Sequence, residues 1–178
     1  MCFICQGGTL EQFNQHLHEQ IRTKGFALSP VGSGWNDQGF AYTIGLVDGR
    51  DHPELVVVSC QLIDAVAALD ELALSVVQGS RFEAGGNGIV GDSVVGFREV
   101  RARHIQRGLM DGWFSYYREV GRYDLEVRAL QVVLPDRRRC HECQTTQPHL
   151  DSDLHVSFTG PGRQARRAHL QRAPRRRR

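Results

Sequence analysis

Apolar residues recur every three or four positions near the start of the chain, which predicts an amphipathic helix over residues 9–25. The repeating positions are Leu10, Phe13, Leu17 and Ile21. Thr9 and Gln12 match an N-terminal capping box, and Gly25 is a typical helix stop signal. An apolar stripe of the same kind predicts a second helix over residues 61–78.

Several other segments have the composition of β-strands. Short apolar runs at residues 26–31 and 39–46 are separated by a Gly/Asn/Asp loop, and a third run at 54–60 is apolar enough for burial on both faces. Residues 82–100 alternate turn glycines with apolar pieces, which predicts a β-hairpin. Residues 126–136 read as a last strand, ended by a proline.

The order of these elements predicts the fold class. Aromatic residues concentrated in 112–120 predict a short third helix. Because the elements do not follow a regular strand–helix–strand order and the hairpins imply antiparallel pairing, we expect an α+β fold: a mixed, largely antiparallel sheet with two or three packed helices. We expect one domain over residues 1–150 and an Arg-rich, disordered tail over residues 151–178.

Charge is distributed unevenly over the 178 residues. Residues 163–178 contain 8 Arg and no acid, so residues 1–162 carry 14 basic and 20 acidic groups, a net charge of −6. The basic tail could contact nucleic acid or an acidic partner by non-specific, salt-dependent attraction, stay solvated, or fold back on the acidic body. No apolar stretch approaches the roughly 18–20 residues of a membrane helix, and no signal-peptide pattern opens the chain. We therefore expect a cytoplasmic protein without a membrane segment.

Four of the five cysteines form two C-x-x-C knuckles, Cys2 with Cys5 and Cys140 with Cys143. A two-residue gap lets both sulfurs reach one ion, and zinc prefers four thiolate or imidazole ligands, so the knuckles predict a structural zinc site with His141 as a substitute ligand. The knuckles are more than 130 residues apart, so the fold must bring its two ends together. A redox-active dithiol and chance occurrence are the alternatives.

Three further features of the sequence need interpretation. Removal of Met1 would leave Cys2 with its own α-amine as a base, as in N-terminal nucleophile enzymes, and the chain start resembles that of the glutamine amidotransferases over two or three residues. Cys60, at the end of an apolar strand, is interpreted as a buried hydrophobe. Residues 86–91 match G-x-G-x-x-G, but a strand rather than a helix follows them, which favours a hairpin over a dinucleotide site.

Four blocks of sequence carry a family resemblance. They are Met1-Cys2-x-x-Cys5, FAYTIGL at 40–46, HPEL at 52–55 and LQVVLPD at 130–136. In this order and spacing they resemble a bacterial family catalogued as domain of unknown function 4262, from Met1 to about Asp136. The resemblance implies no activity, cofactor or site. Many members continue with a Phe-Pro-Trp-like segment that Arg137–Cys143 replaces here, so the family does not imply the second knuckle.

Polar residues in two of these blocks form a candidate pocket. They are Tyr42, Thr43, His52 and Glu54. Gly45 permits close approach of a neighbouring chain or ligand, and Glu54 follows Pro53 at a strand entrance. Such side chains can line a pocket or cap and pair backbone groups. We therefore expect an accessory or binding protein with a zinc site; the alternative is an enzyme with its pocket at these residues and Cys2 as candidate nucleophile.

Overall fold

The computed structural model describes residues 7–32, 39–59, 61–135 and Leu150. The helices in these ranges are α1 (Leu10–Lys24), α2 (Leu46–Arg50), α3 (Leu62–Val77), α4 (Ala102–His104), the π-helical turn η2 (Ile105–Leu109) and α5 (Asp111–Glu119). The strands are β1 (Ala27–Gly32), β2 (Gly39–Ile44), β3 (Glu54–Ser59), β4 (Asn87–Val90), β5 (Ser93–Glu99) and β6 (Ala129–Val133).

The strands form one mixed sheet in the order β1-β2-β3-β6-β5-β4. Neighbouring strands are antiparallel except for β3 and β6, which are parallel. Two local antiparallel groups, β1-β2-β3 and β4-β5, are therefore joined by β6. This arrangement confirms the predicted α+β class with a largely antiparallel sheet.

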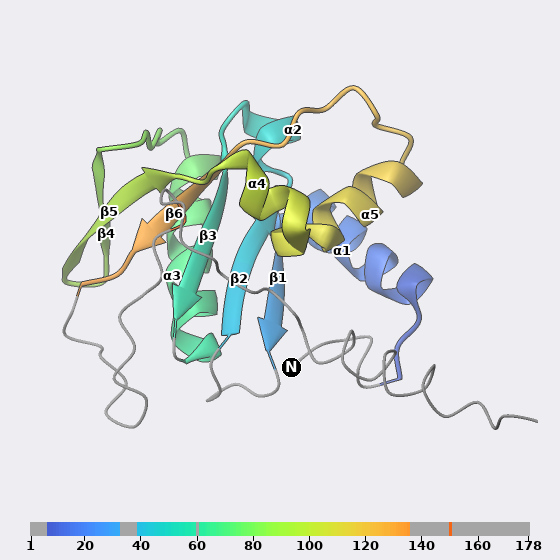
Figure 1. The fold of residues 1–178 in the computed structure, drawn as a ribbon, viewed down its shortest axis with the longest axis horizontal. Helices are drawn as coiled ribbons and strands as arrows, with labels where there is room; N and C mark the ends of the chain where they lie inside the picture. Colours follow the sequence, from blue (N-terminus) through green and yellow to red (C-terminus); the bar gives the residue numbers. More distant parts are fainter. Residues whose placement is uncertain (1–6, 33–38, 60, 136–149, 151–178) are drawn as a thin grey trace, which may run out of the picture.

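Helices cover the sheet on both faces, so the fold has three layers (Figure 1). Helix α3 packs on one face through an apolar stripe that includes Leu69 and Leu72. On the other face, Leu17 of α1 and Trp113 of α5 lie in a second apolar cluster. The central strand β3 contributes to both clusters, and Val56 and Val57 are fully buried. The apolar run at 55–58 reflects this burial on two sides.

Local signals in the sequence place α1 correctly. Thr9 Oγ1 accepts a hydrogen bond from Gln12 N at 3.1 Å, and Gln12 Oε1 accepts one from Thr9 N at 3.0 Å, which is the predicted capping box. Gly25 ends the helix in the left-handed region, with φ of +86°. The limits of two strands were predicted wrongly: β2 stops at Ile44, where the chain turns into α2, and β6 begins only at Ala129.

Leu150 packs against the body of the fold. Its side chain is fully buried in the second apolar cluster. Its N–H donates to Gln131 Oε1 at 2.7 Å, and its carbonyl accepts a hydrogen bond from Arg101 N at 3.2 Å. None of the helices in the described part of the chain is long and apolar enough to cross a membrane.

Candidate functional site

Glu54 supplies the carboxyl group of the predicted pocket. Its side chain is fully buried, and both oxygens accept hydrogen bonds from protein donors. The donors are Thr43 Oγ1 (2.6 Å), Gly45 N (2.9 Å), Trp113 Nε1 (3.2 Å), Val47 N (3.3 Å) and Leu46 N (3.4 Å). These donors come from β2, from the first turn of α2 and from α5. Glu54 therefore joins three elements at the start of β3.

The backbone around Gly45 explains how this contact forms. Gly45 has φ of +117°, a conformation that glycine adopts without strain, and it turns the end of β2 into α2. A Cβ at this position would lie 3.2 Å from Ile21 Cγ1 and 3.3 Å from the Gly25 carbonyl. The turn aims the first N–H groups of α2 at the Glu54 carboxyl, where a negative charge is favourable.

Burial dominates the ionisation of Glu54. It raises the pKa of this carboxyl to about 7, although the surrounding N–H and O–H donors act to lower it. The pKa of the nearby Tyr117 phenol is raised by its own burial and then by the charge of Glu54. The Glu54 carboxyl can therefore change its charge near neutral pH inside the fold.

Thr43 uses its hydroxyl in two directions. It donates to Glu54 Oε2 at 2.6 Å and accepts from Leu55 N at 2.8 Å. The residue is fully buried. Thr43 therefore joins the end of β2 to the start of β3 and fixes the Glu54 side chain.

His52 is buried, and both of its ring nitrogens have backbone partners. Nε2 lies 3.0 Å from Phe82 N, which can only donate, so Nε2 is the acceptor and the proton is on Nδ1. Nδ1 then donates to the Pro53 carbonyl at 2.6 Å. Burial lowers the pKa of His52, opposed by its bond to Pro53 and assisted by the positive charges of Arg81 and Arg128.

Tyr42 connects the sheet to α5. Its hydroxyl accepts a hydrogen bond from Gly112 N at 3.0 Å, and burial raises the pKa of this phenol to about 12. A Cβ on Gly112 would lie 2.6 Å from the Tyr42 oxygen, so only glycine allows this approach. Of the four predicted pocket residues, Thr43 and Glu54 bond to each other, whereas Tyr42 and His52 bond to other parts of the chain.

The predicted metal ligands lie outside the described residues. This applies to Cys2, Cys5, Cys140, Cys143 and His141, and also to Cys60. Within the described ranges, no group of three or more His, Cys, Asp or Glu side chains is placed to hold a metal ion. The zinc site stays a prediction.

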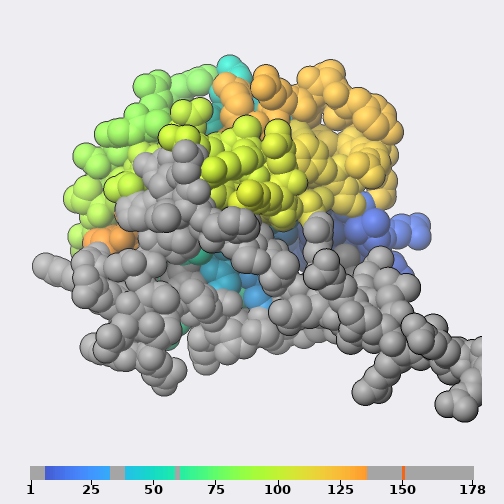
Figure 2. All heavy atoms as spheres, viewed as in Figure 1, coloured from blue at the N-terminus to red at the C-terminus, as the bar shows by residue number. Residues whose placement is uncertain are grey.

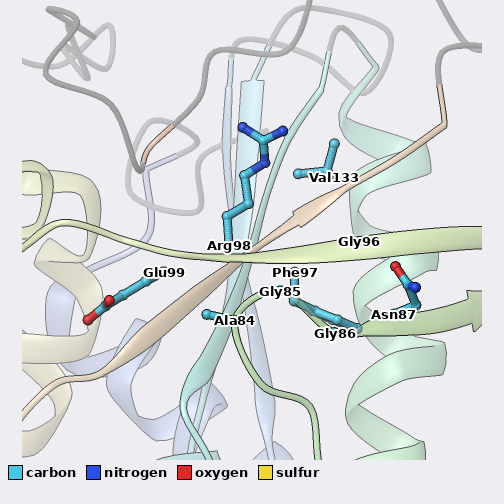
Figure 3. Close-up of a pocket in the computed structure, with 9 residues that line it drawn as sticks. All are labelled: Ala84, Gly85, Gly86, Asn87, Gly96, Phe97, Arg98, Glu99 and Val133. Atoms are coloured by element: carbon cyan, nitrogen blue, oxygen red, sulfur yellow. The ribbon is translucent and has the colours of Figure 1, made fainter.

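An open groove lies beside a glycine bulge at the start of β4 (Figure 3). Gly86 N donates to the Glu83 carbonyl at 3.0 Å, closing a β-turn in which Gly85 has φ of +84°. Gly85 N donates to the Phe97 carbonyl at 2.8 Å, and Phe97 N donates to the Gly86 carbonyl at 3.1 Å, so two residues face one, as in a G1 bulge. The groove has a volume of about 510 Å³.

The sides of this groove differ in chemistry. Arg98 and Val133 project from one side of their strands, and Glu99 projects from the other (Figure 3). The G-x-G-x-x-G match at residues 86–91 begins in the bulge and ends in the β4–β5 turn, which confirms the predicted hairpin. Sequence patterns missed both the bulge and the bond from Trp113 to Glu54. The adjacent glycines at 85 and 86 were the available signal for the bulge.

Comparison with known proteins identifies the family. The model of the family described as Domain of unknown function (DUF4262) matches residues 20–141, which is more than half of the chain. No curated protein and no solved structure matches this sequence. The matched region includes β1 to β6 and the Glu54 cluster with its donors. The chain belongs to the DUF4262 family, as its sequence blocks suggested.

Proposed function

We propose that this chain is an accessory or binding protein, and that Tyr42, Thr43, His52 and Glu54 support its fold. The observation that carries the proposal is the bonding of Glu54, whose two oxygens accept five hydrogen bonds from three elements. A carboxyl held in this way serves as a cap for α2 and a tie to α5. Its role is that of a central structural contact.

The alternative, an enzyme with its pocket at these residues, requires an opening of the interior. The four side chains are at most 2% exposed. A substrate could reach Glu54 only if the contacts with α2 and Trp113 were broken, which would leave several buried N–H groups without an acceptor. Each such group would cost about 1–3 kcal/mol. This cost favours the supporting role.

The second part of the proposal is a structural zinc ion bound by Cys2, Cys5, Cys140 and Cys143. Its support is the spacing of the two knuckles, since each pair can place both sulfurs on one tetrahedral ion. Zinc binding would close a chain loop of more than 130 residues and so reduce the entropy of the unfolded state. His141 is the substitute ligand.

Metal analysis together with thiol labelling tests this function. We expect one zinc per chain in the purified protein, all four knuckle cysteines protected from an alkylating reagent, and loss of zinc in the Cys140→Ser/Cys143→Ser variant. Cys60→Ser is the matched control and should keep its metal. Metal-free protein with one hyper-reactive Cys2 would contradict the proposal and support the enzyme alternative.

The Arg-rich segment 163–178 lies outside the described residues. Non-specific nucleic-acid association through it stays a prediction. Binding to DNA that weakens with salt and disappears when residues 163–178 are deleted would support it. Salt-dependent binding that survives the deletion would contradict it.

A further inference from the structure

The two edges of the sheet are protected differently. At the β1 edge, Pro30 has no N–H to offer and Leu28 N donates to Gln20 Oε1 at 3.3 Å. The other edge is β4, which pairs only with β5 in the described part of the chain. Its sequence, Asn-Gly-Ile-Val, contains neither a charged residue nor proline. An edge without such protection is a template for another strand.

The bulge fixes which backbone groups of β4 face outward. Because Gly86 and Phe97 form a hydrogen-bonded position, antiparallel alternation gives inward bonding to Gly88 and Val90. The N–H and C=O groups of Asn87 and Ile89 then point away from β5. They are spaced two residues apart, which is the repeat of a β-ladder. One added strand could therefore bond to all four groups.

Exposed apolar side chains lie next to this edge. Ile89 is 66% exposed and its cross-strand partner Val94 is 64% exposed. Glu71 of α3 accepts a hydrogen bond from Gly91 N at 2.9 Å, which brings this flank of the helix against the β4–β5 turn. The hairpin lies at the margin of the molecule in the space-filling view (Figure 2).

Carboxylates stand at both ends of the edge. Glu83 precedes the bulge, and Glu99 lies beside it on the side of β5 opposite to Arg98; both carboxylates are exposed. At the other end, Asp92 and Glu71 flank the β4–β5 turn, and both are exposed. A second copy of β4 paired antiparallel would bring these acidic ends together. A strand with basic residues on both sides of an apolar centre is complementary to them.

We propose that the outer edge of β4 binds an extended peptide segment of a partner protein as an additional strand. The segment has an apolar centre that lies beside Ile89 and Arg or Lys residues at both ends. Backbone bonds to Asn87 and Ile89 supply affinity, and the carboxylates select the charge of the partner. This inference rests on the proposed binding role and names its partner class.

Fluorescence anisotropy with the full chain and a labelled peptide tests the proposal. The probe is Arg-Arg-Val-Thr-Val-Thr-Val-Arg-Arg, and the matched probe has Glu in place of every Arg. We expect the basic probe to bind with an affinity that falls as salt is added. The acidic probe should bind at least about tenfold more weakly than the basic one. A peptide with the sequence of residues 163–178 carries positive charge without the apolar centre. Equal binding of that peptide or of the acidic probe would overturn the proposal.

Variants of Ile89 separate strand addition from surface attraction. Its N–H points away from β5, so Ile89→Pro removes an outward donor and leaves the β4–β5 bonds in place. Ile89→Thr is the control because it keeps the N–H. We expect Ile89→Pro to bind the basic probe at least about tenfold more weakly, the equivalent of one lost hydrogen bond. Equal affinities of the two variants would overturn the proposal.

A charge variant keeps the proposal testable if Ile89→Pro does not fold. Glu83→Gln/Asp92→Asn should weaken binding about three- to tenfold at low salt. Glu11→Gln/Glu19→Gln on α1 changes the net charge equally and should have no effect. Equal weakening by both pairs would overturn the proposal. So would a wild-type dimer that Ile89→Pro abolishes, because it would assign the edge to a second copy. Zinc content and thiol protection are measured separately, so the peptide result does not decide them.

Discussion

Glu54→Gln is the most informative substitution in this fold, because the burial of Glu54 has a measurable consequence for stability. Burial raises the pKa of Glu54 from 4.5 to about 7. An acid whose pKa is higher in the folded state than in the unfolded state binds its proton more tightly when folded. Its contribution to stability is complete below pH 4.5 and is lost as the pH rises through 7.

The size of this loss follows from the two pKa values. A shift from 4.5 to about 7 corresponds to a total of about 3 kcal/mol. Between pH 5 and pH 8 the difference between the folded and unfolded pKa values predicts that about 2–3 kcal/mol of the free energy of unfolding disappears. Glutamine cannot ionise, so Glu54→Gln should lack this loss. Its amide N–H groups would also face donors, which lowers stability by about 1–3 kcal/mol at every pH.

Urea unfolding at pH 5 and pH 8, followed by tryptophan fluorescence, measures the effect. Trp113 donates to Glu54, so its emission reports this part of the core. The quantity to compare is the change in unfolding free energy between the two pH values, wild type against variant. His52 is present in both proteins, and its opposite pH dependence cancels.

Parallel pH dependence in the two proteins, within about 0.5 kcal/mol, would refute the burial argument. A wild type that gains stability with rising pH relative to Glu54→Gln would mean that the donors around Glu54 outweigh its burial. The pKa of the carboxyl would then lie below 4.5. The first outcome would remove the predicted pH effect of Glu54 and the second would reverse its sign; both would leave the structural role of the hydrogen bonds in place.

Three further predictions concern the contacts that surround this site. Gly112→Ala would place a Cβ 2.6 Å from the Tyr42 oxygen, so we expect a loss of about 1–3 kcal/mol in urea unfolding, partly restored in Gly112→Ala/Tyr42→Phe; no recovery would contradict the steric cause. The pKa of His52 is lowered in the fold, so its contribution to stability is present above pH 6.5 and lost as the pH falls through the folded pKa. His52→Asn should remove this acid sensitivity, and amide exchange at Phe82 should be faster in the variant at neutral pH; an unchanged exchange rate would contradict the assigned bond. Gly85→Ala would force a side chain into φ of +84° and should cost about 1–2 kcal/mol, whereas an effect below 0.5 kcal/mol would argue against the bulge geometry.

Helices α1 and α3 were predictable because each is specified by neighbours in sequence. Thr9 and Gln12 define the start of α1, and the apolar stripe of α3 has the period of its buried face. The limits of β2 and β6 depended on contacts between distant residues. The run at 39–46 reads as one strand, but Gly45 turns the chain so that the next residues bond to Glu54. The pattern of residues 39–46 does not include the Glu54 carboxyl, so it cannot show where the strand ends.

The candidate site was predictable in composition and not in bonding. Thr43 and Glu54 were singled out as polar residues at strand ends, and they do bond to each other. The bond from Trp113 to Glu54 joins residues 59 positions apart. The sequence marked the element that carries Trp113 only as a short helix rich in aromatic residues. The hydrogen bond from Gly112 N to the Tyr42 hydroxyl likewise joins residues 70 positions apart. Contacts of this range are set by how α5 lies on the sheet.

The parallel pairing of β3 and β6 has a consequence for folding. Glu54 pairs with Ala129 and Leu55 with Leu130, so this pairing closes a long chain segment, whereas β1-β2-β3 and β4-β5 can each form from nearby sequence. Long-range pairing is slow, because the loop must be ordered before its contacts form. Until β6 arrives, β3 and β5 are both open edges of apolar strands. The interval before its insertion is therefore the stage at which this chain is most exposed to aggregation during synthesis.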